Sequence, residues 1–206
     1  MGLYDKYILP HLLKVAMGQQ NITDQRTKAV PLAQGRVLEI GLGAGHNIPH
    51  YNSAQVDVVY GLEPSAEMRA IAAPLIESAE VEVELLDSSA EDIPLESGSV
   101  DTVLTTFTLC TVGDTQAALA SMRRVLKPGG RLVFCEHGIS PDPSIRKWQE
   151  RINPIWRPLG GGCNINRDIP KLLTDSGFHI EALETGYLPQ TPRVLSYNYW
   201  GHAAIR

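Results

Sequence analysis

Cysteine, aromatic residues and long apolar runs are all scarce in this chain. Its 206 residues include three cysteines, Cys110, Cys135 and Cys163, and only 6% aromatic residues. The odd number and wide spacing of the cysteines match neither a disulfide framework nor a zinc motif, so we expect a reducing, cytoplasmic setting and no metal site. No apolar run approaches the roughly 20 residues of a membrane-spanning helix. The amino-terminal residues also lack the apolar core of a signal peptide.

A surplus of positive charge is also missing. The chain has 18 Lys and Arg against 23 Asp and Glu, a formal net charge of -5, and no long block of like charges. Nucleic-acid binding relies on basic surfaces that displace counterions, so we expect no nucleic-acid partner. The length and the 43% hydrophobic content suit one globular domain.

What the chain does have is an alternation of apolar strands with amphipathic helices. The sequence predicts strands at 37–40, 56–62, 81–86, 101–107, 131–136, 178–186 and 194–205. It predicts helices over 4–17, after Ser65, and over 117–126 and 168–176, with a loop and a short helix in 19–35. Strand–helix repeats with continuously apolar strands indicate an α/β protein whose parallel sheet is covered on both faces, a Rossmann-like doubly wound fold.

We divide this single domain, 1–206, into four segments. Residues 1–35 form an N-terminal helical lid, 36–137 the cofactor-binding core, 138–166 an insertion over the active face, and 167–206 a C-terminal helix with two strands. In residues 140–166, four prolines, two tryptophans and Gly160-Gly161-Gly162 break the alternation of strands and helices, which indicates an insertion.

The strongest local motif is Glu39-Ile40-Gly41-Leu42-Gly43-Ala44-Gly45, which follows the first predicted strand. Glycines there allow a tight turn and the close approach of a ligand. A helix expected after the loop would offer its first amides, at 44–47, to an anionic group. A dinucleotide-binding loop requires glycine where this chain has His46, which disfavours NAD.

Two further polar positions follow the second and third strands. Glu63 comes 22 positions after Gly41 and is suited to bind both hydroxyls of a ribose. Ser89, Ala90 and Glu91 form a polar loop that could hold an adenine. Ser89 is also a candidate helix N-cap, with Asp92 three residues later.

An ordered set of motifs resembles one known family, the class I S-adenosylmethionine-dependent methyltransferases of the ubiquinone and menaquinone biosynthesis type. The motifs lie at 38–45, 61–65, 90–94, 99–103 and 124–130. Glu136-His137, Trp148-Gln149, Pro154, Trp156, Gly162-Cys163 and Arg167 are similar to small thiol methyltransferase-like proteins. This resemblance implies a seven-stranded sheet of order 3-2-1-4-5-7-6, strand seven antiparallel, and S-adenosylmethionine as cofactor.

The resemblance also implies a set of site residues. It places Glu39, Gly41, Gly43 and Gly45 around the methionine end of the cofactor and Glu63 on the ribose. It places Ser89, Ala90 and Glu91 on the adenine, and Thr106 beside the methyl donor.

Candidates for the acceptor side come from other segments. We expect the substrate pocket to be lined or roofed by Tyr4, Tyr7, Cys110, Trp148 and Trp156, and Cys163 is either a pocket residue or a structural one. His137 ends the fifth strand and is a candidate general base, with a structural role equally open.

The leading functional hypothesis is methyl transfer to a small lipophilic acceptor, with a thiol as one candidate. A quinone-like acceptor, a phospholipid amine and a non-catalytic cofactor-binding module are the alternatives, and an NAD-dependent oxidoreductase is a competing class. Peripheral membrane contact and the oligomeric state stay open at this point.

Overall fold

The computed structural model describes residue 4 and residues 7–205, and in this part of the chain seven strands form one sheet. Their order is β3-β2-β1-β4-β5-β7-β6, and β7 runs antiparallel to β5 and β6 while the other neighbouring pairs are parallel. The strands are β1 (Gly35–Ile40), β2 (Val56–Leu62), β3 (Val83–Leu86), β4 (Val100–Thr106), β5 (Leu126–His137), β6 (Phe178–Tyr187) and β7 (Tyr197–Ile205). The fold class and strand order expected from the sequence are confirmed.

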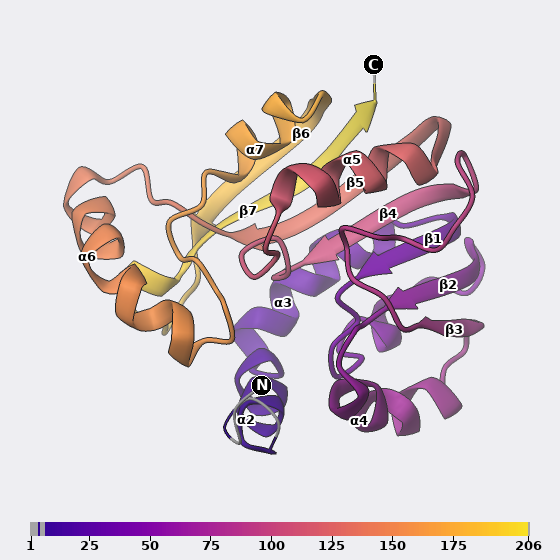
Figure 1. Ribbon diagram of the computed structural model, residues 1–206, viewed down its shortest axis with the longest axis horizontal. Coiled ribbons are helices and arrows are strands. Elements are labelled where there is room, and N and C mark those ends of the chain that lie inside the picture. Colours follow the sequence, from indigo (N-terminus) through magenta and orange to yellow (C-terminus); the bar gives the residue numbers. More distant parts are fainter. Residues whose placement is uncertain (1–3, 5–6, 206) are drawn as a thin grey trace.

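Helices cover both faces of this sheet (Figure 1). They are α2 (Leu9–Met17), α3 (Gln20–Ala29), α4 (Ala66–Glu77), α5 (Thr115–Val125), α6 (Pro143–Leu159) and α7 (Ile169–Asp175), with short 3₁₀ turns η1 (Val30–Leu32), η2 (Ile48–His50) and η3 (Arg193–Leu195). Of the predicted lid, residues 1–3 and 5–6 lie outside the described residues.

Alternate residues of the central strands point to opposite faces, and both faces are buried. Leu38 packs in the cluster that contains α5 and α7, whereas its neighbour Val37 packs with residues of α3 and η1. Both side chains are fully buried. Since side chains fill both faces of the sheet, the ends of the strands are the places left for a ligand, as in other doubly wound folds.

Side-chain caps explain where several helices begin. Ser65 accepts a hydrogen bond from the Met68 amide at 3.2 Å, as its predicted capping role requires. Asp114 accepts from the amide of Ala117 at 3.0 Å, and this cap starts α5 two residues earlier than the predicted 117.

Two predicted helix starts are wrong. No α-helix follows the glycine loop, because Gly45 turns the chain with φ +80° and only the 3₁₀ turn η2 fits before β2. Ser89 caps no helix, and its carbonyl instead accepts the Asp92 amide in a turn at 3.1 Å. The amides of residues 44–47 therefore belong to a loop and not to the first turn of an α-helix. Any ligand there meets this loop.

The insertion and the fifth strand also differ from the prediction. The insertion, for which the sequence predicted no helix, is mostly α6. Pro143 lies in its first turn, where no helical N–H is lost, and Asp142 caps its start. β5 begins at Leu126 rather than 131. Leu126 pairs with Val100 and Arg131 with Thr102, so a bulge contains the predicted turn.

None of the helices in the described part of the chain is long and apolar enough to cross a membrane.

Candidate functional site

Most of the predicted cofactor residues, together with His137 and Cys110, lie at or after the carboxyl ends of the parallel strands β1 to β5. Because these strands are parallel, their carboxyl ends share one edge of the sheet. The α2–α3 segment and α6 lie at this edge (Figure 1). The Tyr4 hydroxyl donates to the Leu159 carbonyl at 2.8 Å, which ties the N-terminal segment to the end of α6.

The glycine loop has one crowded and one open position. A side chain on Gly41 would lie 2.6 Å from the side chain of Thr108, so glycine is needed for the loop to pack on the segment after β4. A side chain on Gly43 would meet nothing nearer than Met68, at 3.6 Å, although φ is +58°. The space beside Gly43 suits a bound cofactor.

Glu63 lies beside this loop with its carboxylate already oriented. One oxygen accepts the Gly43 amide and the other accepts the Ser65 amide, both at 2.9 Å. Burial raises the pKa of Glu63, while these two hydrogen bonds oppose the rise. Each carboxylate oxygen has a second acceptor position, so two ribose hydroxyls can still be bound.

A buried polar network joins Glu39 and Thr106, two residues predicted from the sequence. Arg26 of α3 donates to Asn47 and Thr106, each at 2.7 Å. Asn47 and Tyr51 in turn donate to Glu39 at 2.8 and 2.6 Å. Burial raises the pKa of Glu39 to about 7, and the hydrogen bonds from Tyr51 and Asn47 limit the rise.

Arg26, Asn47 and Tyr51 were missed by the sequence analysis. Asn47 follows the glycine loop closely enough to have been suspected, but Arg26 stands in a polar segment that gave no functional signal. Within the described residues the Nε of Arg26 has no hydrogen-bond partner, although it is buried. This unpaired cationic donor fits a carboxylate such as the one at the methionine end of S-adenosylmethionine.

The adenine candidates are held by the start of α5. Glu91 accepts the Asp114 amide at 3.2 Å, and the Ser121 hydroxyl donates to the Glu91 carbonyl at 2.8 Å. Burial acts to raise the pKa of Glu91, but hydrogen bonds from backbone amides and from Ser89 outweigh it and lower the pKa. Ala90, between Ser89 and Glu91 in the sequence, is buried.

Three residues that are far apart in sequence meet beyond β4 and β5. The Sγ of Cys163 lies 3.2 Å from the Nε2 of His137, and the donor atoms of Cys110, His137 and Cys163 all lie within 4.8 Å of one another. We call these residues the Cys–His–Cys cluster. The sequence analysis named all three singly but expected no metal site, because intervals of 27 and 26 residues form no ligand motif.

The electrostatics of the cluster favour a thiolate on one cysteine. A hydrogen bond with Cys110 lowers the pKa of Cys163; burial opposes the shift, and His137 reinforces it. Burial acts to lower the pKa of His137, but its contacts with Cys163 and Glu136 outweigh this and raise it. The indole N–H of Trp156 also donates to the Sγ of Cys163 at 3.3 Å.

Two other aromatic candidates are largely exposed. Trp148 and Tyr7 are more than half exposed, at 55% and 59%. The guanidinium of Arg151 lies 5.7 Å from the centre of the Trp148 ring. Of the two predicted tryptophans, Trp156 contacts the cluster through its hydrogen bond to Cys163, whereas Trp148 is exposed.

Buried Glu136 fixes the segment that carries Cys110. Its carboxylate accepts the amides of Thr108 and Leu109 at 3.0 and 3.1 Å. Burial raises the pKa of Glu136 to about 7, and these hydrogen bonds limit the rise. The sequence analysis used Glu136 only as part of the family resemblance and did not assign it a role.

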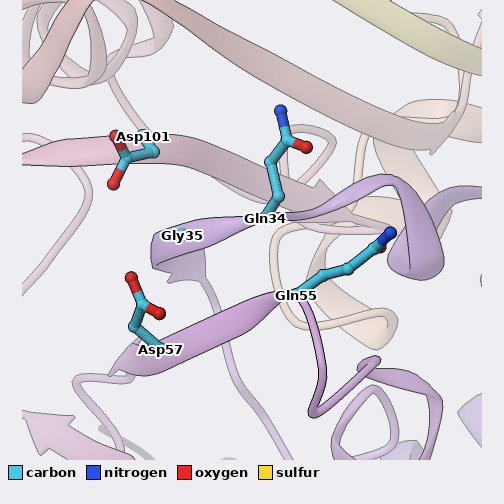
Figure 2. A pocket seen from close by; sticks show the side chains of 5 residues that line it. All are labelled: Gln34, Gly35, Gln55, Asp57 and Asp101. Carbon is cyan, nitrogen blue, oxygen red and sulfur yellow. The ribbon is translucent and has the colours of Figure 1, made fainter.

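An open depression of about 420 Å³ lies at the opposite edge of the sheet, lined by Gln34, Gly35, Gln55, Asp57 and Asp101 (Figure 2). These residues lie at the amino-terminal ends of β1, β2 and β4. Ligands of doubly wound sheets bind at the carboxyl ends, so this depression is not the cofactor site.

A Rossmann-like sheet with this loop and an acidic residue after β2 defines a class of proteins that bind a nucleoside-containing cofactor. A methyltransferase domain model matches residues 38–134. Human thiol S-methyltransferase TMT1B is 31% identical over 178 residues, which cover 82% of this chain and 72% of the human protein.

Two further comparisons agree. A demethylmenaquinone methyltransferase of Clavibacter sepedonicus is 32% identical over 122 residues, 59% of this chain and 49% of that protein. A Thermotoga maritima structure, titled a SAM-dependent methyltransferase and possible histamine N-methyltransferase, superposes with a TM-score of 0.68 at 20% identity and covers 98% of both chains. The chain belongs to the S-adenosylmethionine-dependent methyltransferase family, and S-adenosylmethionine is its cofactor.

Proposed function

We propose that this enzyme transfers a methyl group from S-adenosylmethionine to the sulfur of a small lipophilic thiol. The similarity to human thiol S-methyltransferase carries the proposal, because its 178 aligned residues extend well beyond the domain match at 38–134. The similarity to the demethylmenaquinone methyltransferase covers a smaller share of the chain. Residues outside the common core are those expected to select an acceptor.

The cofactor would be held by residues at the carboxyl ends of β1, β2 and β4. Glu63 would accept the ribose hydroxyls, the space beside Gly43 would take the body of the cofactor, and Arg26 would face its carboxylate. Glu39 and Thr106 would act through the network that positions Arg26 and Asn47. The adenine would lie against Ser89, Ala90 and Glu91.

When bound, the cofactor supplies a methyl group on an electrophilic sulfonium. The protein then has to align the acceptor and exclude water from the site. A free thiol has a pKa of about 8.5, so a small fraction is already the nucleophilic thiolate near neutral pH. An acceptor of this kind needs less help from a general base than an amine or a phenol.

His137 has a different role here from the general base considered above. Its Nε2 faces the Sγ of Cys163 at 3.2 Å, and its ring also hydrogen-bonds the backbone of Leu195. Both contacts hold the imidazole against the protein. We therefore assign His137 to holding Cys163.

The test is methyl transfer from radiolabelled S-adenosylmethionine to matched small thiols, quinols and amines. We expect labelled thioethers from alkyl and aryl thiols, and Glu63→Gln should reduce their formation. Turnover of a quinol or an amine, with none of any thiol, would overturn the acceptor class. Cofactor binding without turnover of any acceptor would instead indicate a binding module.

A further inference from the structure

The Cys–His–Cys cluster is assembled from three separate elements. Cys110 comes four residues after the end of β4, His137 is the last residue of β5, and Cys163 follows the end of α6. Cys110 is fully buried, whereas Cys163 is half-buried. The fold therefore brings two thiols and one imidazole to a site with access from one side.

The spacing of the three donor atoms suits a tetrahedral metal ion. Zinc lies about 2.3 Å from sulfur and about 2.0 Å from nitrogen, so its ligand atoms are roughly 3.5–3.8 Å apart. In this cluster the three atoms are within 4.8 Å of one another, and Sγ of Cys163 is 3.2 Å from Nε2 of His137. Side-chain shifts of less than about an ångström would bring all three onto one ion.

Neighbouring groups hold the three residues in place. The Asn164 amide donates to the Cys110 carbonyl at 3.0 Å, and Trp156 donates to the Cys163 sulfur at 3.3 Å. The His137 ring also hydrogen-bonds the backbone of Leu195. Imidazoles that bind metals are usually fixed in this way through the ring nitrogen that does not face the ion.

We propose that Cys110, His137 and Cys163 bind a zinc-like divalent cation and leave its fourth coordination position to the sulfur of the acceptor thiol. Three protein ligands with one open position are typical of catalytic zinc sites, whereas structural sites have four. The assignment of the fourth ligand rests on the proposed thiol acceptor, but the metal site itself does not.

The chemical step at this site is a deprotonation. The S–H bond of the acceptor breaks, a metal–sulfur bond forms, and the proton passes to water. A thiol bound to zinc is deprotonated outright, so the nucleophile is available below the ordinary thiol pKa. The acceptor thus reaches the methyl donor as a thiolate.

The cluster also lies next to the cofactor loop. Gly41 packs so tightly on Thr108 that a side chain there would approach within 2.6 Å, and Thr108 lies two residues before Cys110. The ring of Phe107 is close to both regions, with its centre 6.5 Å from that of His137 and 5.4 Å from the Arg26 guanidinium carbon. An acceptor at the fourth position would therefore approach the cofactor from the side of the segment after β4.

The first experiment measures metal binding without cofactor or thiol. The reduced protein is stripped with a chelator and titrated with Co²⁺ and Zn²⁺. We expect one ion per chain, intense visible bands of tetrahedral Co²⁺ and a sulfur-to-cobalt charge-transfer band. Cys163→Ala and His137→Gln should weaken binding by roughly a hundredfold or more. Cys135→Ala is the matched control, because Cys135 is a buried thiol outside the cluster.

Two results would overturn the metal site. One is weak Co²⁺ binding by the wild type, equal to that of the variants. The other is a Cys110–Cys163 disulfide in the purified protein together with no metal uptake after reduction. Circular dichroism of Cys163→Ala and His137→Gln separates loss of ligands from loss of the fold.

The second experiment adds a small alkyl thiol to the cobalt form without cofactor. We expect the visible bands to shift, and a matched alcohol to leave them unchanged. Metal binding without a shift would overturn the fourth-position assignment. Metal binding with a shift but no methylated thiol would contradict the proposed function alone, and thiol turnover by a metal-free enzyme would contradict this inference alone.

Discussion

Glu63 is a buried carboxylate beside the glycine loop. Two backbone amides orient it and leave an acceptor position on each oxygen. We expect Glu63→Gln to weaken S-adenosylmethionine binding by about 1.5–3 kcal/mol, the range for hydrogen bonds to a charged group. That is a loss of roughly tenfold to over a hundredfold, measurable by calorimetry. Glu77→Gln, on the exposed end of α4, is the control and should bind normally; equal affinity for both variants would remove the ribose role.

Glu39 makes the stability of the cofactor-free protein depend on pH. Its pKa is raised from 4.5 to about 7, so the folded state holds the proton more tightly than the unfolded state. The contribution of Glu39 to the free energy of unfolding therefore falls as the pH rises from 4.5 to about 7 and is level above that. Glu39→Gln should remove about 2–3 kcal/mol of this fall between about pH 5 and pH 8. Urea denaturation at the two pH values measures it, and parallel slopes for the two proteins would contradict the prediction.

The glycine loop is an element whose open space can be tested with a matched pair of glycines. Gly43 and Gly98 have φ of +58° and +63°. A Cβ atom added to either glycine would meet no other atom nearer than 3.6 Å. Gly43→Val and Gly98→Val should therefore cause similar backbone strain. Only Gly43→Val should lose cofactor affinity, by roughly a hundredfold or more, or at least about 2.8 kcal/mol. Equal affinity in equilibrium dialysis would mean that the cofactor lies elsewhere.

The buried side chain of Gln149 connects helix α6 to the segments beside the site. Gln149 accepts the Ser140 amide and donates to the carbonyls of Gly138, Ile165 and Val194. Gln149→Leu would leave these buried groups without partners, and we expect a loss of about 3 kcal/mol in the free energy of unfolding. The exposed neighbour Glu150 is the control, because Glu150→Leu should change stability by less than about 0.5 kcal/mol. Similar denaturation midpoints for the two variants would show that α6 is held by other contacts.

For the whole molecule, cofactor binding should appear as thermal stabilisation. A ligand at 100 times its dissociation constant adds about 2.7 kcal/mol to the free energy of unfolding. In a protein of this size that raises the melting temperature by roughly 5–11 °C, readable by scanning calorimetry. NAD is the control and should produce no shift, because His46 replaces the glycine of a dinucleotide loop. A shift with NAD alone would favour the oxidoreductase class.

Local patterns predicted most of the fold. The strand at 56–62 matches β2 residue for residue, and the Ser65 cap starts α4 as expected. Predictions failed where one pattern allowed two structures. The glycine loop leads into a 3₁₀ turn rather than an α-helix, and the prolines near 143–158 are accommodated within α6.

The sequence by itself determined the α/β class, the glycine loop after the first strand and the position of Glu63 after the second, because each depends on neighbouring residues along the chain. Only the tertiary structure decided which distant polar groups meet. Arg26 reaches Thr106 across 80 positions, and Cys110, His137 and Cys163 come together from three elements. Such contacts depend on how parallel strands align their carboxyl ends, and no spacing within a short segment records that alignment.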